Sequence, residues 1–183
     1  MRRRPPQHRR RALPRRAIVW FPPTALLTDV EAFRAQHDPL ASLLPAHVTL
    51  VFPFESSLSA LQVAAHVRRI AARWPRVPVR MESACALLGE WVNLPLTSGR
   101  DAVVEMHDRL YGGVLAPFLR RDLRYDPHLT VGRAADADAC EMMLAAARLA
   151  FPRALEATLD SLTICTLAAD GRRVVREYEI GVG

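Results

Sequence analysis

Hydrophobic and polar positions along the chain follow two periods, and each change of period marks a predicted element. Continuous or alternating apolar runs predict strands, whereas apolar residues three or four positions apart predict helices. We expect strands at 17–21, 47–52, 77–88, 90–96, around 128–131, at 155–167 and at 173–180. The same patterns predict helices at 28–37, 59–74, 101–119 and 138–151.

Turn and capping residues support these boundaries. Thr28 and Glu31 have the spacing of a capping box at the start of the first helix, and Ser59 opens the second. Pro75 and Pro152 end two of the helices because proline cannot continue a helical hydrogen-bond ladder. A glycine at 89 and the segment 169–171 join the flanking strands in two expected hairpins.

The order of the predicted elements occurs twice: strand, helix, short strand, helix, proline, long strand. Each short strand carries the triplet His-x-Thr after a proline, as His47-Val48-Thr49 and His128-Leu129-Thr130. The two histidines are 81 residues apart, and Pro75 and Pro152 are 77 apart. This agreement predicts an α+β fold of two similar lobes related by a pseudo-two-fold axis, with an antiparallel sheet.

The repeated triplet brings candidate chemistry. Side chains alternate faces along a strand, so His47 and Thr49 share one face, and His128 and Thr130 do the same. If the fold joins these faces, two imidazoles and two hydroxyls surround a space about the size of one phosphate, which indicates acid–base chemistry on a phosphodiester. For a single triplet the alternative is a strand histidine that is bonded locally. Two copies at matching places favour catalysis.

The positive net charge of the chain comes from its first residues and not from the predicted domain. The formal net charge is +6, but residues 1–16 hold eight of the 25 basic residues and no acid, which leaves 17 against 19 acidic residues. We therefore predict a disordered arginine-rich tail at 1–16 and one two-lobed domain at 17–183. The tail has two interpretations: a weak nucleic-acid contact, or compositional padding that includes a wrongly assigned start.

Further features narrow the class of protein. The apolar run after the tail is too short for a secretory or membrane-spanning segment, so we expect a cytoplasmic protein without membrane contact, and a monomer. Cys85, Cys140 and Cys165 are widely spaced within apolar runs, which is typical of buried, reduced thiols rather than disulfides or a zinc site.

The sequence resembles the two-histidine (2H) phosphoesterases, which include 2'-5' RNA ligase-like proteins and cyclic phosphodiesterases. The similarity is greatest to a small bacterial branch, on the segments His37-Asp38-Pro39, 44–54 and 127–133, and it covers nearly all of the chain from Ala17 onward. The resemblance implies two lobes whose antiparallel sheets face a central cleft, with helices outside. It also implies that His47, Thr49, His128 and Thr130 are catalytic and that no cofactor or metal is needed.

For a 2',3'-cyclic phosphate, one neutral imidazole would activate water and the other, protonated, would protonate the leaving ribose oxygen. Histidine can serve both roles because its ordinary pKa is about 6.5. The sequence leaves open which histidine is the base and whether hydrolysis or 2'-5' ligation occurs.

Three residues beside the motifs are candidate substrate contacts. Arg133 would bind phosphate, although its odd spacing from His128 predicts the opposite face of the strand. Tyr125 and Phe54 could stack on a base, with core packing as the alternative for both. The remaining histidines are predicted to be non-catalytic: His8, His37, His66 and His107.

Two function classes remain open from the sequence. The first is a phosphoesterase that acts on an RNA end or a small cyclic nucleotide, and the slightly acidic body favours the smaller substrate. The second is a non-catalytic RNA or nucleotide binding protein that uses the same cleft.

Overall fold

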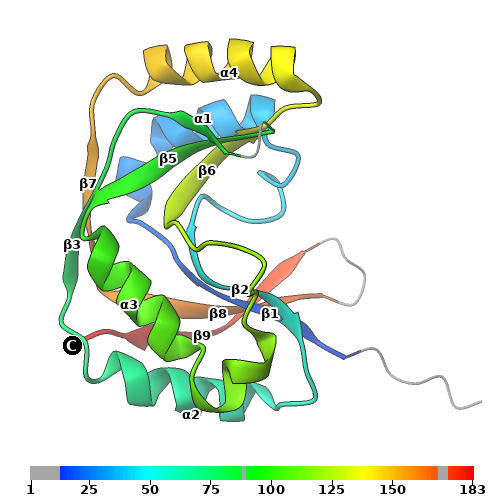
Figure 1. Cartoon of the computed structure of the whole chain (residues 1–183), viewed down its shortest axis with the longest axis vertical. Coiled ribbons are helices and arrows are strands. Elements are labelled where there is room, and N and C mark those ends of the chain that lie inside the picture. Colours follow the sequence, from blue (N-terminus) through cyan, green and yellow to red (C-terminus); the bar gives the residue numbers. More distant parts are fainter. Residues whose placement is uncertain (1–12, 88–89, 169–172) are drawn as a thin grey trace, which may run out of the picture.

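The computed structural model describes residues 13–87, 90–168 and 173–183. Within these ranges the chain forms an α+β fold (Figure 1). The strands are β1 (Arg15–Trp20), β2 (Val48–Glu55), β3 (Val77–Met81), β4 (Cys85–Leu87), β5 (Trp91–Ser98), β6 (His128–Arg133), β7 (Leu155–Leu159), β8 (Ser161–Leu167) and β9 (Val174–Gly181). The helices are α1 (Thr28–His37), α2 (Ala60–Ala71), α3 (Arg100–Leu110) and α4 (Ala137–Ala150), with short 3-10 turns η1 (Thr24–Leu26) and η2 (Gly113–Phe118).

The described strands form one antiparallel path in the order β7-β3-β5-β6-β2-β1-β8-β9, with β4 paired to β5. The two motif strands, β2 and β6, lie next to each other at its centre. Four strands of the path therefore lie on each side of this junction, which confirms the predicted α+β fold with two similar halves.

Helices cover the sheet in an exchanged pattern. Helix α1 follows β1 in the chain but packs mainly on β6, and α3 follows β5 but packs mainly on β2. Helix α2 covers β8 and β9, and α4 lies over β4, β5 and β6, so the two pairs of helices lie toward opposite ends of the molecule (Figure 1). Each motif strand is thus covered by a helix from the other half of the chain.

The pattern of the motif strands explains their place in the core. Val48, Leu50, Leu129 and Val131 are fully buried. The residues between them are half-buried, so alternation puts the apolar side chains on one face and the motif side chains on the other.

Several predicted boundaries are wrong for local reasons. The helix expected to reach residue 119 ends at Leu110, and a 3-10 turn follows in which Gly113 has φ +55°. The strands expected at 77–88 and 155–167 are each interrupted, because β3 and β4 pair with different stretches of β5, while β7 pairs with β3 and β8 with β1. The expected hairpin turns at 89 and 169–171 lie outside the described residues.

The capping predictions have opposite outcomes. Ser59 caps α2 with Gln62 as its capping-box partner. Thr28 instead lies inside α1, whose N-cap is Leu27 without a side-chain hydrogen bond. The carboxylate of Glu31 is used elsewhere, since it accepts hydrogen bonds from Ala46 N–H and from the side chain of Arg34.

The predicted tail boundary at residue 16 is also wrong. Strand β1 includes Arg15 and Arg16, and Arg16 is buried at 6% exposure. Its guanidinium pairs with Glu177 at 2.8 Å and donates to the carbonyl oxygen of Leu58 at 2.9 Å. These contacts let a charged residue occupy a buried position. The rest of the predicted tail, residues 1–12, lies outside the described residues.

All three cysteines are free, with Cys140 and Cys165 buried and Cys85 only half-buried. Burial raises the pKa of the Cys165 thiol to about 11. Within the described ranges, no helix combines the length and the apolar character that crossing a membrane requires.

Gly99 gives a test of this packing. It precedes α3 with φ +73°, and a Cβ there would lie 2.4 Å from the carbonyl oxygen of Pro78. Gly99→Ala is therefore expected to lower the free energy of unfolding by roughly 2 kcal/mol or more, measured by urea denaturation. Gly181→Ala is the matched control, because nothing lies within 4 Å of its added Cβ. Equal effects of the two substitutions would contradict the tight approach at Gly99.

Candidate active site

The two motifs meet at the junction of β2 and β6. Val48 pairs directly with Leu129 in antiparallel register. One residue further in each direction, this register places His47 across from Thr130 and Thr49 across from His128. All four side chains leave the sheet on the face opposite the buried Val48 and Leu129. The fold therefore brings the imidazoles and hydroxyls together on one face, with two-fold symmetry about a single residue pair.

Both imidazoles are oriented in the same way. The Nδ1 of His47 lies 2.8 Å from the carbonyl oxygen of Pro45, and the Nδ1 of His128 lies 2.6 Å from that of Asp126. A carbonyl oxygen only accepts hydrogen bonds, so each Nδ1 must carry the proton. In the neutral rings, Nε2 is then unprotonated and available to accept a proton.

Burial lowers the pKa of both motif histidines below the ordinary 6.5. The carbonyl oxygens of Pro45 and Asp126 oppose this change by stabilising the protonated rings. Around His47, the positive charge of Arg34 lowers the pKa further, the carboxylate of Asp38 raises it, and protonated His128 lowers it. His128 is thus close enough to His47 for its charge to act on the pKa of His47.

The two threonines differ in their surroundings. Thr130 donates its hydroxyl proton to the Oδ1 of Asn93 at 2.8 Å, across the β5–β6 pair. The Asn93 amide in turn donates to the carbonyl oxygen of Trp91 at 3.3 Å. For Thr49, the described part of the chain provides no hydrogen-bond partner for the hydroxyl. Sequence reasoning missed Asn93, although a single amide between Val92 and Leu94 in an apolar strand was the available signal.

Side chains complete the main-chain bonding of β2 beyond the junction. Tyr125 donates its hydroxyl proton to the carbonyl oxygen of Thr49 at 2.8 Å. The Nδ1 of His107 lies 2.7 Å from the carbonyl oxygen of Leu50, and the N–H of Phe52 donates to the hydroxyl of Tyr111 at 3.0 Å. Helix α3 and the segment before β6 thus hold the first motif strand where its pairing with β6 ends.

The structure places the two aromatic candidates in packed positions. One face of the Tyr125 ring is stacked on His107, with ring centres 3.6 Å apart. Phe54 is 5% exposed and packs against Phe118, so its ring belongs to the core and is not available to stack on a base. The other histidines have local roles: His107 supports β2, and His66 contacts the carbonyl oxygen of Leu110.

The face predicted for Arg133 is wrong because β6 contains a bulge. Thr130 pairs with Asn93 but Gly132 pairs with Val92, which leaves Val131 as an extra residue and reverses the alternation. Arg133 pairs with Trp91, which shares the face of Asn93 and Thr130. Its guanidinium lies 4.9 Å from the Trp91 ring centre and 3.2 Å from Glu90. Phosphate binding by Arg133 stays a prediction, and the bulge places Arg133 on the same face of the sheet as Thr130.

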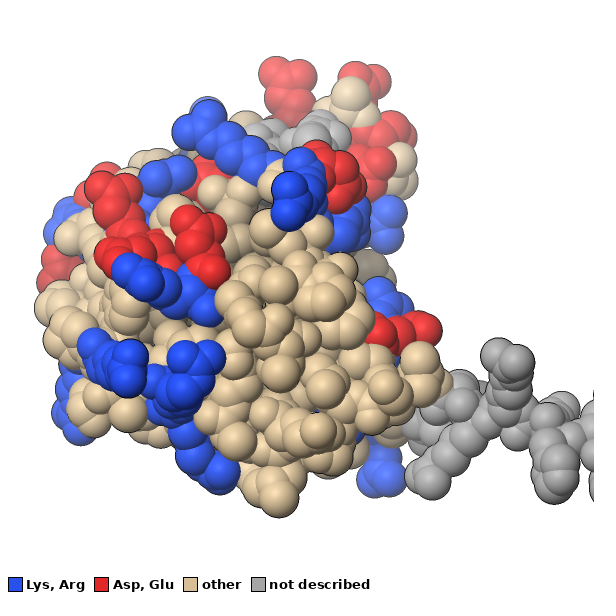
Figure 2. All heavy atoms as spheres, turned by 60° about the horizontal axis from the view of Figure 1, so that its bottom comes forward, with Lys and Arg blue, Asp and Glu red and all other residues tan. Residues whose placement is uncertain are grey.

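Outside the motifs, a cavity of about 590 Å³ lies between α2 and α3. Its lining combines Arg69, Arg73 and Arg109 with Glu105 and Asp108, and it contains no motif residue. Figure 2 shows basic and acidic side chains side by side on this face, next to a broad uncharged area. No group of three or more potential metal ligands occurs in the ranges that the structure describes.

Comparison with known proteins identifies the family. The family model of the 2'-5' RNA ligase superfamily matches residues 22–171. The chain therefore belongs to the 2'-5' RNA ligase superfamily, which confirms the resemblance noted in its sequence. A protein of Geobacillus kaustophilus named "Putative phosphoesterase" is 29% identical over 118 residues, which cover 63% of this chain and 67% of that protein. A Bacillus licheniformis protein with the same description is 27% identical over 119 residues, which cover 63% and 69% of the two chains.

Solved structures share the fold. LigT of Escherichia coli complexed with 3'-AMP has a TM-score of 0.62 at 17% identity, over 93% of this chain and 98% of LigT. TT0787 of Thermus thermophilus has a TM-score of 0.64 at 14% identity, over 92% and 97% of the two chains. At these identities the likeness establishes the fold alone.

The burial of the histidines predicts a pH dependence. His47, His107 and His128 should each titrate below 6.5 in the folded protein, because burial disfavours their protonated forms. The unfolded chain, with histidine pKa near 6.5, then binds these protons first as the pH falls. Their contribution to stability is therefore complete above about pH 6.5 and is lost as the pH decreases toward the folded pKa values. Histidine NMR titration and denaturation at several pH values test both statements, and folded-state midpoints at or above 6.5 would contradict them.

The contact between Tyr125 and Thr49 predicts a stability effect. Tyr125→Phe keeps the ring but leaves the Thr49 carbonyl without its partner, so the free energy of unfolding should fall by about 1–2 kcal/mol in urea denaturation. Tyr178→Phe is a suitable control, since no hydrogen bond of the Tyr178 hydroxyl occurs among the described residues. A Tyr125→Phe variant as stable as the control would show that the hydrogen bond contributes nothing.

Proposed function

We propose that this protein is a metal-independent phosphoesterase that hydrolyses a 2',3'-cyclic phosphate or a 2'-5' linked nucleotide by acid–base catalysis between two histidines. One observation carries the proposal: both imidazoles hold their Nδ1 protons on main-chain carbonyls and share one face of the sheet with two threonine hydroxyls. Two such rings supply one proton acceptor and one proton donor. Superfamily membership supports phosphoester chemistry.

The reaction follows from the tautomers. The unprotonated Nε2 of one histidine takes a proton from water as the water oxygen forms a bond to phosphorus. The bond from phosphorus to one ribose oxygen breaks, and the protonated Nε2 of the other histidine gives its proton to that oxygen. The products are a phosphomonoester and a free ribose hydroxyl. Both histidines return to their starting states after one proton passes back through solvent.

The hydroxyls stabilise the charge that grows on the non-bridging oxygens. Thr49 can donate to such an oxygen directly. Thr130 must first turn its proton away from Asn93, whose Oδ1 accepts it in this structure. Donors directed at the developing charge are usually worth several kcal/mol to the transition state, about 3–4 for a single donor in a well-studied hydrolase.

Several observations favour a small substrate over a long RNA. The body from residue 17 onward is slightly acidic, and basic and acidic groups lie side by side on the face of α2 and α3 (Figure 2). A continuous basic track would be expected for a long polyanion. LigT, which shares the fold, has been solved with 3'-AMP, ATP and phosphate. We therefore infer that the substrate of this chain is a nucleotide phosphate. We also propose that the protein acts in the cytoplasm as a monomer.

Ligation at the same site would use a different nucleophile: the 5'-hydroxyl of a second strand, in place of water, forms a bond to the phosphorus of the cyclic phosphate, and the same ribose oxygen leaves. Water is far more abundant than such an end, so we expect hydrolysis to dominate. Contact between the arginine-rich segment and RNA stays a separate prediction.

The proposal is tested by turnover in the presence of a chelator. The panel comprises 2',3'-cyclic nucleotides, cyclic-ended oligoribonucleotides, 2'-5' linked dinucleotides and ADP-ribose cyclic phosphate. We expect hydrolysis of at least one compound with a bell-shaped pH profile. His47→Ala and His128→Ala should each lower the rate by about 10²–10⁴-fold, since each removes one proton-transfer group.

The matched control is His66→Gln, which keeps a donor for the Leu110 carbonyl and lies outside the motif strands, so its rate should equal that of the wild type. Full activity in either motif variant would overturn the mechanism. Activity that is lost in chelator and restored by a divalent ion would indicate a metal site. Binding across the panel without turnover would favour the non-catalytic alternative.

A further inference from the structure

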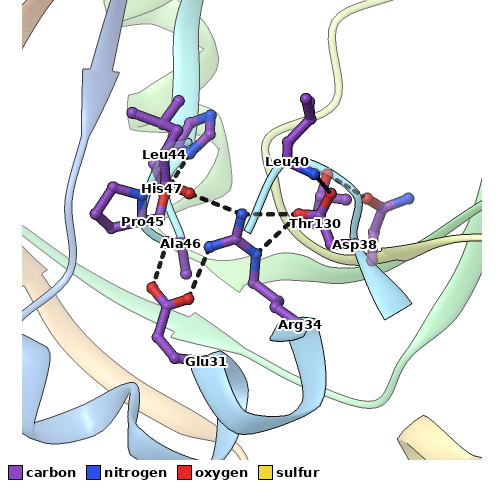
Figure 3. Close-up of polar contacts among 10 residues, drawn as sticks. Glu31, Arg34, Asp38, Leu40, Leu44, Pro45, Ala46, His47 and Thr130 are labelled. Atoms are coloured by element: carbon purple, nitrogen blue, oxygen red, sulfur yellow. Dashed lines mark hydrogen bonds and ion pairs between the residues drawn. The ribbon is translucent and has the colours of Figure 1, made fainter. Parts of the chain in front are cut away.

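A buried cluster of charges lies next to the first motif. Arg34, on α1, is 2% exposed. Its guanidinium pairs with Asp38 at 2.7 Å and with Glu31 at 2.9 Å, and it donates to the carbonyl oxygen of Leu44 at 2.9 Å. Figure 3 shows the guanidinium between the two carboxylates, with the Leu44 carbonyl as its third partner. A buried cation with this many partners is held in one orientation.

The cluster holds two of the three residues before His47, one on each side of Pro45, through their main-chain groups. The Leu44 carbonyl accepts from Arg34, and the Ala46 N–H donates to the second carboxylate oxygen of Glu31 at 2.6 Å. Between them, the Pro45 carbonyl accepts from the Nδ1 of His47. The group that orients the imidazole is thus held on both sides by side chains that pair with each other (Figure 3).

The turn between α1 and this segment belongs to the same unit. Asp38 uses one carboxylate oxygen for Arg34 and the other to accept from the N–H of Leu40 at 2.9 Å. The helix end, the turn and the motif are therefore connected without a regular strand pair. A loop fixed in this way depends on its central cation, because removing one partner leaves buried charge unpaired.

The second motif is supported differently: the N–H of Leu96 donates to the carbonyl oxygen of Pro127 at 3.0 Å, and among the described residues no buried ion pair holds the segment before His128. The carbonyl that orients His128 belongs to Asp126, whose side chain pairs with Arg100 at 2.9 Å. Arg100 and Asp126 are 32% and 48% exposed in their side chains, in contrast to 2% for Arg34. Exposed pairs of this kind contribute little to rigidity. Thus the two histidines have similar immediate contacts, but the side chains that support the segment before each of them differ in burial.

We propose that Arg34 is a positioning residue for His47: its buried guanidinium holds the segment 44–46 in the one conformation that points the Nε2 of His47 into the site. The catalytic meaning of this role rests on the proposed function. The structural part of the role, the tautomer and orientation of His47, exists whether or not a substrate is turned over.

The cluster also acts on His47 through charge. The groups that act on His47 are Arg34 and Asp38 from the α1 side and His128 from β6. The ring of Phe21 also lies near His47, with ring centres 6.0 Å apart, and the guanidinium of Arg176 lies over the Phe21 ring, 4.0 Å from its centre. Loss of Arg34 alone would leave the carboxylates uncompensated, and His47 would become easier to protonate.

The test uses the full chain labelled with ¹⁵N-histidine, so that each imidazole reports its tautomer and titration. In Arg34→Met we expect His47 to lose its preference for the Nδ1–H tautomer and its pKa to rise, while His128 stays unchanged as an internal reference. Arg34→Lys keeps the charge but cannot hold Asp38, Glu31 and Leu44 together, so its tautomer preference should weaken with a smaller rise in pKa.

The matched control is Arg16→Met. Arg16 is a second buried arginine with one carboxylate and one carbonyl partner, but it contacts neither motif. On a substrate that the wild type hydrolyses, kcat should fall about 10²-fold in Arg34→Met with a smaller change in KM, and Arg16→Met should keep both values.

The outcomes separate the two proposals. A folded Arg34→Met protein with an unchanged His47 tautomer and pKa, or equal changes at His47 in Arg16→Met, would overturn the role of Arg34. If Arg34→Met does not fold, the tautomer is read in Arg34→Met/Asp38→Leu, which removes the unpaired buried carboxylate as well. A wild-type protein that is inactive on every substrate would refute the proposed function, and the NMR result would still decide the role of Arg34.

Discussion

The pairing of Val48 with Leu129 is the contact on which the rest of the site depends. It is the one registered pair between β2 and β6 in the described structure, and it sets which side chains of the two motifs face each other. A shift of one residue would turn the histidines into the core and the valine and leucine into the site. Both apolar side chains are fully buried, so the hydrophobic core enforces the register that the proposed chemistry requires.

A single pair is a short connection, and other groups compensate for it. Beyond the junction, Tyr125, His107 and Tyr111 bond the main chain of β2 in place of a neighbouring strand. Ahead of the junction, Arg34 and Glu31 bond the segment that leads into the motif. The strand can therefore diverge from β6 while these main-chain groups keep hydrogen-bond partners.

The sequence predicted the fold class, the two halves and the motif strands because these depend on local periodicity and on a repeat. It failed where long-range partners decide. Glu31 looked like a capping residue, but its two carboxylate oxygens accept hydrogen bonds from Ala46 and Arg34 instead. The bulge at Val131, which moves Arg133 to the other face, is visible only through the β5 register. Arg34 appeared as one position on a helix; its carboxylate partners Glu31 and Asp38 are at local spacings, but its burial depends on the segment after the helix, which reaches its guanidinium through the Leu44 carbonyl.

The exchange of α1 and α3 between the halves has a consequence for how such a chain arises. A half-length chain with one motif would lack both the helix that covers its motif strand and the second imidazole. In a dimer of two identical copies, the helix of each copy could cover the motif strand of the other, as in domain swapping. Such a dimer would have both the covering helices and the two imidazoles around one two-fold axis. Fusion of the copies would make the site independent of protein concentration and would free each half to diverge. The buried arginine behind one histidine and the exposed pair behind the other are the kind of difference that a fused chain can acquire and a symmetric dimer cannot.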